Sequence, residues 1–179
     1  SVYKWKPGEG VSLFLKNSGY SGLAPFMGKE PGSNGLTLDD QGRLVLCRHG
    51  DRQIGRLESN GMIVSLVDHY NGHRVNSPND LVFKSNGDLY FTDPPFGLPQ
   101  AFDDPRKAHV QGVYRLSQDG KVTLLIHDIK APNGIAFSPD EKTLYVSDVD
   151  PKRAAWLAYD VNKDGTVTNG RQFFDATRW

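Results

Sequence analysis

The sequence has a single cysteine, Cys47, among its 179 residues, which excludes an internal disulfide and any zinc module built from several cysteines. It also lacks an excess of either charge, because 21 Lys and Arg residues balance 21 Asp and Glu residues. A neutral chain is unsuited to wrapping nucleic acid or coating an anionic membrane. No run approaches the roughly 18 consecutive apolar residues that a membrane-spanning helix needs. We therefore expect neither nucleic acid nor a membrane among its partners.

Familiar catalytic signatures are missing too. The chain has no Gly-x-Ser-x-Gly elbow, no His-Glu-x-x-His and no phosphate-binding glycine loop. No segment shows a helical apolar stripe of useful length. The first residues, Ser-Val-Tyr-Lys-Trp-Lys, are not a signal peptide, although one could have been removed. The compartment therefore stays open between the cytoplasm and the periplasm or exterior.

What the sequence does contain is a repeat. Similar segments begin at Asn34, Asn79 and Asn133, which are 45 and 54 residues apart, and each reads as a strand, a polar turn and a returning strand. A third strand follows each hairpin, at 53–58, 112–117 and 155–161, and a glycine-containing turn then leads to a fourth strand. Four-stranded units of about 50 residues are typical of β-propeller blades.

The pattern predicts an all-β fold, a partial β-propeller with about 3.5 four-stranded blades. The half-blade is expected at 1–17 and the blades at about 34–70, 79–129 and 133–176. Propellers close with about 4–8 blades, and each blade buries its apolar face only against a neighbour. We expect the rest of the ring to come from a longer protein, which we favour, or from a second copy of the chain.

The three asparagines are the first candidates for chemistry. They open the innermost strand of each blade, and such strands start at one mouth of a propeller channel, so we expect Asn34, Asn79 and Asn133 to converge. An amide oxygen is a hard, neutral ligand that suits Ca²⁺ or a similar cation. The alternative is that Asn before Gly only serves a turn.

Residues after the second strands are the next candidates. Asp93 and Asp148 occupy equivalent places, where a carboxylate can face the channel or cap a loop, and the following Pro94-Pro95 favours a cap for Asp93. His49 is assigned the matching place in the earlier blade, as a substrate contact, a proton shuttle or a loop histidine without a catalytic role. Cys47 is interpreted as a core residue, because nothing nearby clearly lowers its pKa.

Longer segments resemble a known family. SPNDLVFKSNGDLYFTDPPFGL at 77–98 and APNGIAFSPDEKTLYVSD at 131–148 closely resemble bacterial gluconolactonases, of the family shared with senescence marker protein 30 and luciferin-regenerating enzyme. EPGSNGLTLDDQGRLVL at 30–46 and GRQFFDAT at 170–177 resemble the same subgroup, so the likeness covers essentially the whole chain. It implies a six-bladed propeller that hydrolyses sugar lactones with one divalent cation, most often Ca²⁺, with Mg²⁺, Mn²⁺ or Zn²⁺ as alternatives.

The resemblance also implies roles for particular residues. The family's metal is held by a Glu of the first blade, by an Asn that maps onto Asn133, and by an Asp of a later Pro-Asp-Gly motif. Asn79 maps beside the metal, as a second amide near it and a contact for substrate or water. The Glu and the Asp, which is the expected general base, have no counterpart in these residues, so the isolated chain is expected to be inactive. Ser77 stands where some relatives place Arg, which leaves the choice of lactone open.

The predicted site therefore contains Asn133 and Asn79 at the metal, and Asn79, His49, Asn34 and Asp148 as substrate or water contacts. A small-molecule lactone is the predicted substrate. Two other functions stay open: a propeller that binds or scaffolds without catalysis, and a related metal-dependent esterase or phosphotriesterase. Channel-lining Asn and Asp residues in register favour an enzyme, whereas a flat aromatic or charged rim would favour a binding module.

Overall fold

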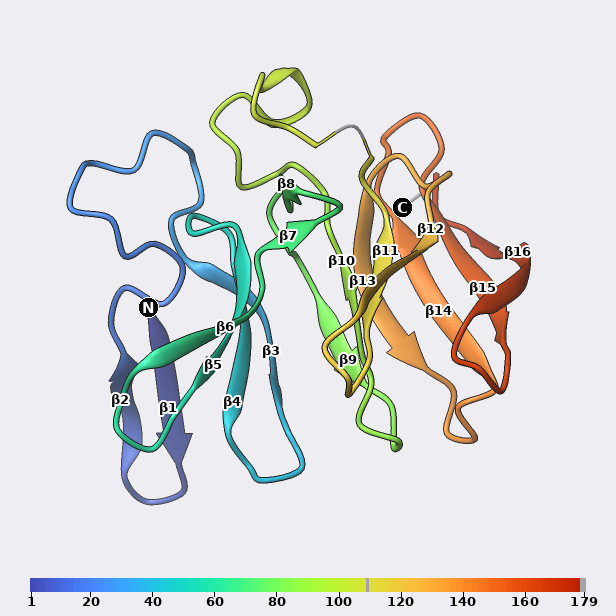
Figure 1. The fold of residues 1–179 in the computed structure, drawn as a ribbon. Coiled ribbons are helices and arrows are strands. Elements are labelled where there is room, and N and C mark those ends of the chain that lie inside the picture. Colours follow the sequence, from blue (N-terminus) through green and yellow to red (C-terminus); the bar gives the residue numbers. More distant parts are fainter. Residues whose placement is uncertain (109, 178–179) are drawn as a thin grey trace.

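A computed structural model of the protein describes residues 1–108 and 110–177 and confirms the all-β class. Within these ranges, three antiparallel four-stranded sheets stand side by side, preceded by a two-stranded hairpin (Figure 1). The hairpin consists of β1 (Val2–Lys6) and β2 (Gly10–Leu15). No helix in the described part of the chain is long and apolar enough to cross a membrane.

Each sheet is formed by four strands that follow one another in the chain. The first sheet contains β3 (Ser33–Leu38), β4 (Leu44–Arg48), β5 (Gln53–Leu57) and β6 (Ile63–Val67). The second contains β9 (Leu81–Phe83), β10 (Leu89–Thr92), β11 (Val113–Leu116) and β12 (Val122–Ile126). The third contains β13 (Pro132–Phe137), β14 (Thr143–Asp148), β15 (Ala155–Val161) and β16 (Val167–Asp175). All twelve strands lie where the repeat predicts a strand.

Two elements depart from the predicted repeat. The expected fourth strand of the first repeat ends at Val67, and the chain continues into a small hairpin of β7 (His69–Tyr70) and β8 (His73–Arg74). Its turn residues Asn71 and Gly72 both have positive φ, which suits a tight hairpin turn. A single turn of 3-10 helix, η1 (Ala101–Asp103), lies in the long connection between β10 and β11.

The sheets pack face to face through two apolar cores. The first and second sheets enclose a core that includes Val45, Ile54, Phe91 and Tyr114, whose last two rings stack with centroids 5.4 Å apart. The second and third sheets enclose another core around Tyr90, Leu144 and Val146. Burial of such side chains contributes about 1.5–3 kcal/mol each, so these two interfaces hold the sheets together.

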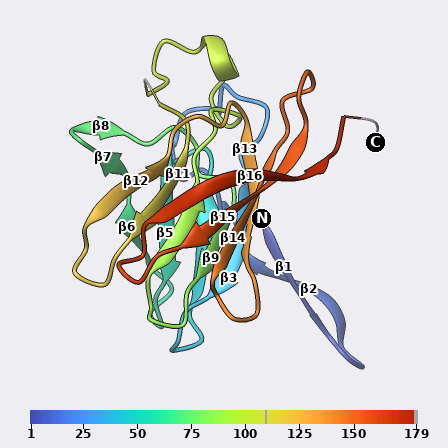
Figure 2. The same ribbon diagram turned by 90° about the vertical axis from the view of Figure 1, so that its right-hand side faces the viewer.

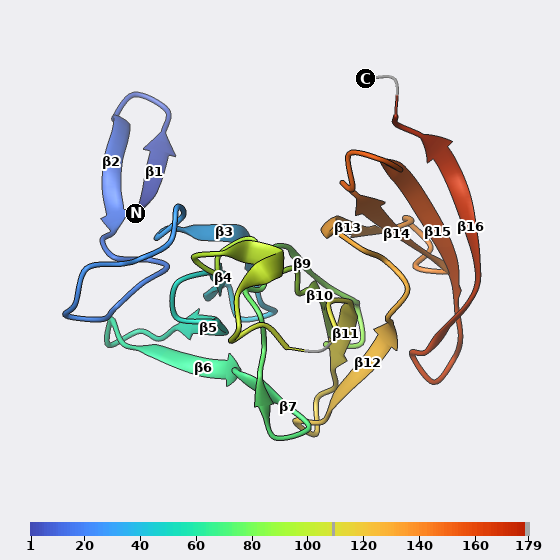
Figure 3. The same cartoon turned by 90° about the horizontal axis from the view of Figure 1, so that it is seen from above.

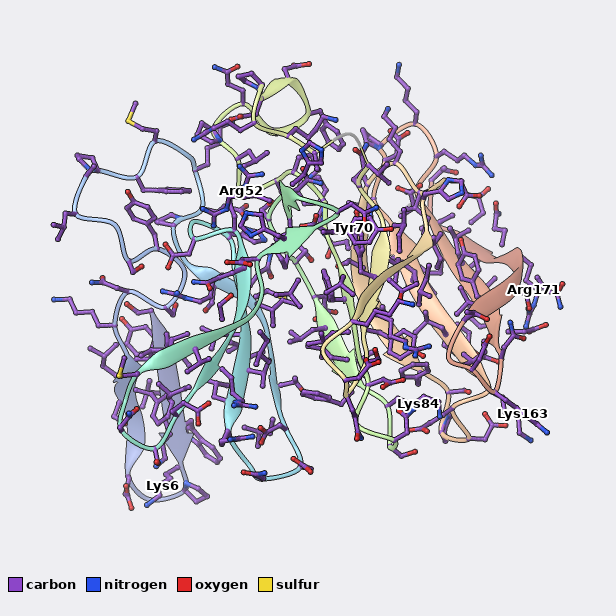
Figure 4. All side chains as sticks on the ribbon, viewed as in Figure 1. Lys6, Arg52, Tyr70, Lys84, Lys163 and Arg171 are labelled. Atoms are coloured by element: carbon purple, nitrogen blue, oxygen red, sulfur yellow. The ribbon has the colours of Figure 1, made fainter. Side chains whose placement is uncertain are left out.

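The sheets are arranged in an open arc. In the view from above, the β1–β2 hairpin stands at one end and β16 at the other (Figure 3), and the hairpin projects away from the sheets in the side view (Figure 2). The inner strands β3, β9 and β13 are neighbours within the arc. Arg52 lies beside the β7–β8 hairpin (Figure 4), where its Nε donates to the carbonyls of Val75 at 2.9 Å and Asn76 at 3.0 Å, fixing the segment that enters β9.

Candidate functional site

Each candidate asparagine lies in a β-bulge at the start of an inner strand. Pairing of β3 with β4 shifts between Ser33 and Leu36, so Asn34 and Gly35 stand opposite one residue of β4. β13 repeats this shift with Asn133 and Gly134. Bulges re-aim a side chain and are frequent beside active sites. The Asn-Gly pairs therefore serve bulges rather than the turns considered from the sequence.

The middle asparagine has the same arrangement. The N–H of Asn79 donates to the carbonyl of Thr92 at 2.9 Å, and the N–H of Thr92 donates back to the carbonyl of Asp80 at 3.0 Å. Two residues of the inner strand thus share one residue of β10. The regular ladder begins only at Leu81, which pairs with Phe91.

Direct contacts join the three bulges. The N–H of Gly35 donates to the carbonyl of Asn79 at 2.7 Å. The hydroxyl of Thr92 donates to the carbonyl of Asn133 at 2.7 Å, and the Asp80 carboxylate accepts the N–H of Ile135 at 3.0 Å. The predicted convergence of Asn34, Asn79 and Asn133 is therefore present in the backbone. Thr92 and Asp80, which the sequence did not single out, hold it together.

The side-chain amides of Asn79 and Asn133 keep their capacity for a ligand. Neither makes a hydrogen bond to another residue in the described part of the chain, although Asn79 is only 3% exposed. An amide without such a partner suits an oxygen-seeking cation or a hydroxyl group. Among the described residues there is no group of three or more His, Cys, Asp or Glu side chains that could hold a metal ion. The donors at hand are neutral oxygens, which suit Ca²⁺ or Mg²⁺ better than thiolate-seeking metals.

Asn34 has a different environment, because its amide meets His49. Asn34 Nδ2 lies 3.4 Å from His49 Nε2, and His49 Nδ1 lies 3.2 Å from a carboxylate oxygen of Glu30. His49 is 1% exposed, and burial lowers its pKa while the Glu30 charge raises it. The structure thus brings the predicted residues Asn34 and His49 together and adds Glu30.

The loop after β10 covers this histidine. The Ser77 hydroxyl donates to the carbonyl of Pro94 at 2.6 Å and accepts the N–H of Gly97 at 2.9 Å. A Cβ on Gly97 would stand 2.8 Å from both His49 Cβ and Ser77 Cβ, so glycine is needed at this close approach. Ser77 therefore anchors the loop, and its hydroxyl is already engaged.

The two candidate aspartates cap loops. Oxygens of Asp93 accept the N–H groups of Asn76 at 2.7 Å and Ser77 at 2.9 Å, and burial raises the pKa of Asp93 to about 7 although these donors oppose the rise. Asp148 accepts the N–H of Ala131 at 3.0 Å through Oδ1. The two carboxylates share one structural role at the entry to β9 and β13. Within the part of the chain that the structure describes, no hydrogen bond joins Asp148 to Asn34, His49 or Asn79.

One equivalence drawn from the sequence is wrong. In the ladder, Arg48 stands opposite Ser33 as Asp148 stands opposite Pro132, so Arg48 and not His49 matches the aspartates. The turn between the paired residues Leu38 and Leu44 is one residue shorter than the turn between Phe137 and Leu144, and this offset hides the register in the sequence. Arg48 is buried and pairs with Asp51 at 2.6 Å. Cys47 is fully buried, which raises its thiol pKa well above the usual value, so it is a core residue as predicted.

Comparisons with known proteins agree with this architecture. The family model described as SMP-30/Gluconolactonase/LRE-like region matches residues 2–178. A gluconolactonase of Zymomonas mobilis is 41% identical over 169 residues, which cover 93% of this chain and 48% of that protein. A lactonase of Staphylococcus aureus is 30% identical over 145 residues, covering 75% of this chain and 40% of that protein.

A solved structure extends the likeness to three dimensions. A gluconolactonase from Xanthomonas campestris matches with a TM-score of 0.79 and 36% identity, covering 96% of this chain and 54% of that chain. The chain thus spans about half the length of the relatives it matches.

Proposed function

This chain belongs to the SMP-30/gluconolactonase/LRE-like family, and from that premise we propose that it contributes to the hydrolysis of sugar lactones with the help of a divalent cation. The observation that carries the proposal is the meeting of three bulges, which present Asn34, Asn79 and Asn133 at one end of the inner strands. Amides without a partner among the described residues favour a bound ligand over a purely structural scaffold.

Asn79 and Asn133 are the residues that would hold the cation, through their amide oxygens. Their backbones are fixed by one residue, because Thr92 accepts the N–H of Asn79 and donates its hydroxyl to the carbonyl of Asn133. A bound divalent cation polarises a lactone carbonyl and lowers the pKa of a water molecule. Ca²⁺ is the preferred candidate, since neutral oxygen donors suit hard cations, with Mg²⁺ and Mn²⁺ next and Zn²⁺ last.

The other residues of the site position the asparagines and shield the site from water. Ser77 holds the loop from Pro94 to Gly97 against His49, which limits the access of water from that side. Asp93 and Asp148 hold the segments that lead into Asn79 and Asn133. Rigid support of this kind keeps the ligand oxygens in place, which matters because small displacements of reacting groups are costly in rate.

The experiment measures hydrolysis of glucono-δ-lactone by the intact protein, meaning this chain within a completed propeller ring, because the isolated 179 residues are expected to be inactive. Ca²⁺ is either present or removed by a chelator. We expect activity that depends on the cation and that falls about 100-fold in Asn133→Ala, since it loses a ligand. Asn60→Ala is the matched control, because Asn60 lies in an exposed turn where, among the residues described, its amide oxygen accepts only the N–H of Met62. Hydrolysis at the spontaneous rate with Ca²⁺, Mg²⁺ and Mn²⁺, or activity indifferent to the chelator, would contradict the proposal. A neutral phosphotriester is assayed in parallel, and its hydrolysis in preference to the lactone would favour the alternative of a related esterase or phosphotriesterase.

A further inference from the structure

Glu30, His49 and Asn34 form a chain of polar contacts that neither the loop anchors nor the metal amides require. Glu30 Oε2 lies 3.2 Å from His49 Nδ1, and His49 Nε2 lies 3.4 Å from Asn34 Nδ2. Glu30 lies in the loop before β3, His49 directly follows β4, and Asn34 lies at the start of β3. Glu30 is exposed, His49 is buried, and Asn34 is exposed, so the chain runs from solvent through the fold and out at the bulge.

Hydrogen-bond chemistry fixes the direction of this chain. A carboxylate only accepts, so His49 Nδ1 carries the proton that points to Glu30. In a neutral imidazole the other nitrogen is then an acceptor, and it faces the Asn34 amide nitrogen, which only donates. Glu30 therefore selects the tautomer of His49, and the tautomer selects the orientation of the Asn34 amide. Asn34 Oδ1 is left free of this contact.

Packing around His49 restricts the movement of its side chain. Its side chain is 1% exposed, and Gly97 approaches so closely that a Cβ there would lie 2.8 Å from His49 Cβ. The neighbouring Arg48 pairs with Asp51, so its charge is compensated. A buried ring that is contacted at both nitrogens transmits the position of Glu30 to Asn34 with little freedom.

We propose that Glu30 and His49 are positioning residues that orient the Asn34 amide toward the hydroxyl groups of a polyhydroxylated lactone. This inference rests on the proposed function. Within the described residues nothing bonds to the Asn34 amide oxygen or to its second N–H, and this pair matches the donor and acceptor of a sugar hydroxyl. Its bulge is bonded directly to that of Asn79, which brings the amide beside the proposed cation ligands. The three residues thereby favour a sugar lactone over an unsubstituted lactone.

The test compares glucono-δ-lactone with δ-valerolactone, which has the same ring but no hydroxyl groups. In the intact protein with Ca²⁺, we expect Asn34→Ala and Glu30→Gln to lower kcat/KM about fivefold to tenfold on the sugar lactone, mainly through KM. On δ-valerolactone the same variants change kcat/KM less than about twofold, since a lost hydrogen bond of about 1 kcal/mol matters only where a hydroxyl is bound. Both substitutions lie at exposed side chains, which avoids the folding risk of replacing buried His49. Glu58→Gln is the control, because Glu58 pairs with Arg56 on the first sheet, away from the bulges.

The outcomes separate the two proposals. A structural role would lower kcat/KM equally on both lactones, and that result, or no change on either, would overturn the positioning role while leaving lactone hydrolysis in place. If the unmodified protein hydrolyses neither lactone, the proposed function fails and the positioning role fails with it. Rescue by Glu30→Asp but not by Glu30→Gln would add support, because only the carboxylate selects the tautomer of His49.

Discussion

Leu36 and Leu81 occupy the same register position in neighbouring sheets, opposite Leu46 and Phe91 respectively, yet their surroundings differ. Leu36 is 45% exposed, whereas Leu81 is 5% exposed and belongs to the core between the first and second sheets. The apolar pattern of a strand determines its pleat and pairing. Burial of its face depends on a neighbouring sheet, which the two-stranded hairpin before β3 does not supply.

The third sheet shows the same contrast between its two faces. Its inner face carries Leu144 and Val146 in a core, while Trp156 and Phe173 on the other strands are about half exposed or more. Aromatic contacts join Tyr145 to Phe173 at 5.2 Å and Trp156 to Phe174 at 5.1 Å. Both ends of the arc therefore carry apolar surface of the kind that its middle buries.

The largest effect is expected from shortening matched leucines. Leu81→Ala should lower the free energy of unfolding by about 3 kcal/mol through lost burial and a cavity, and Leu36→Ala by about 1 kcal/mol or less. Urea denaturation followed by circular dichroism measures both, with unchanged slopes as the sign of an unaltered unfolded state. Equal losses would show that the face of the first sheet is covered in solution and would break the contrast.

An intermediate effect is expected at the ion pair between the second and third sheets. The Glu141 carboxylate accepts from Lys84 Nζ at 2.7 Å and from the N–H of Ser85 at 2.7 Å, and these donors lower its pKa to about 2. Because the folded pKa is depressed, the stabilisation is complete above the unfolded pKa near 4.5 and disappears as the pH falls toward 2.

Glu141→Gln should therefore cost about 1 kcal/mol at pH 7 and almost nothing near pH 2. The free energy of unfolding of both proteins, measured across that range, gives the difference. Glu58→Gln, within the first sheet, separates contacts between sheets from contacts inside one. A difference that stays constant with pH would mean that the carboxylate charge has no part in joining the sheets.

The smallest change in stability is expected at the open face of the third sheet. Trp156→Ser should alter the free energy of unfolding by no more than about 1 kcal/mol, because the side chain is already 50% exposed. It should lower self-association, since large apolar patches promote it. Light scattering at micromolar concentration measures the effect, with Trp5→Ser testing the other end. A monomeric unmodified chain would exclude a ring of two copies.

Much of the fold can be predicted from the sequence, because the strands and turns of each repeat are encoded by residues close together in the chain. Alternation of apolar and polar residues predicts the strands of each sheet. The β7–β8 hairpin was not predicted, because strands of two residues are too short to show an alternating pattern. Asn71-Gly72 is a turn signal from which the hairpin could have been predicted. The long connection with η1 contains no period to follow.

The site was predicted in part. The convergence of Asn34, Asn79 and Asn133 was predicted because they repeat at the start of equivalent strands. Glu30 and Thr92 were missed, since their contacts depend on a loop path and on packing between sheets, neither of which leaves a periodic signal. Roles in catalysis and in metal binding remain predictions for the experiments above.

The bulges also constrain how this site can change over evolution. Removing one residue from Asn34-Gly35 or Asn133-Gly134 would restore a regular ladder, and the side-chain period of two means that the residues on one side of the change would exchange faces. An apolar residue would then stand at the channel, or a polar one in the core. Substitution of any one of the three asparagines can change a single side chain of the site. Deletion of a single residue there would instead disrupt the pairing of the whole strand, so we expect such deletions to be eliminated by selection. Proteins that evolve from this chain should therefore differ at these positions by substitutions, while the number of residues in each bulge stays the same.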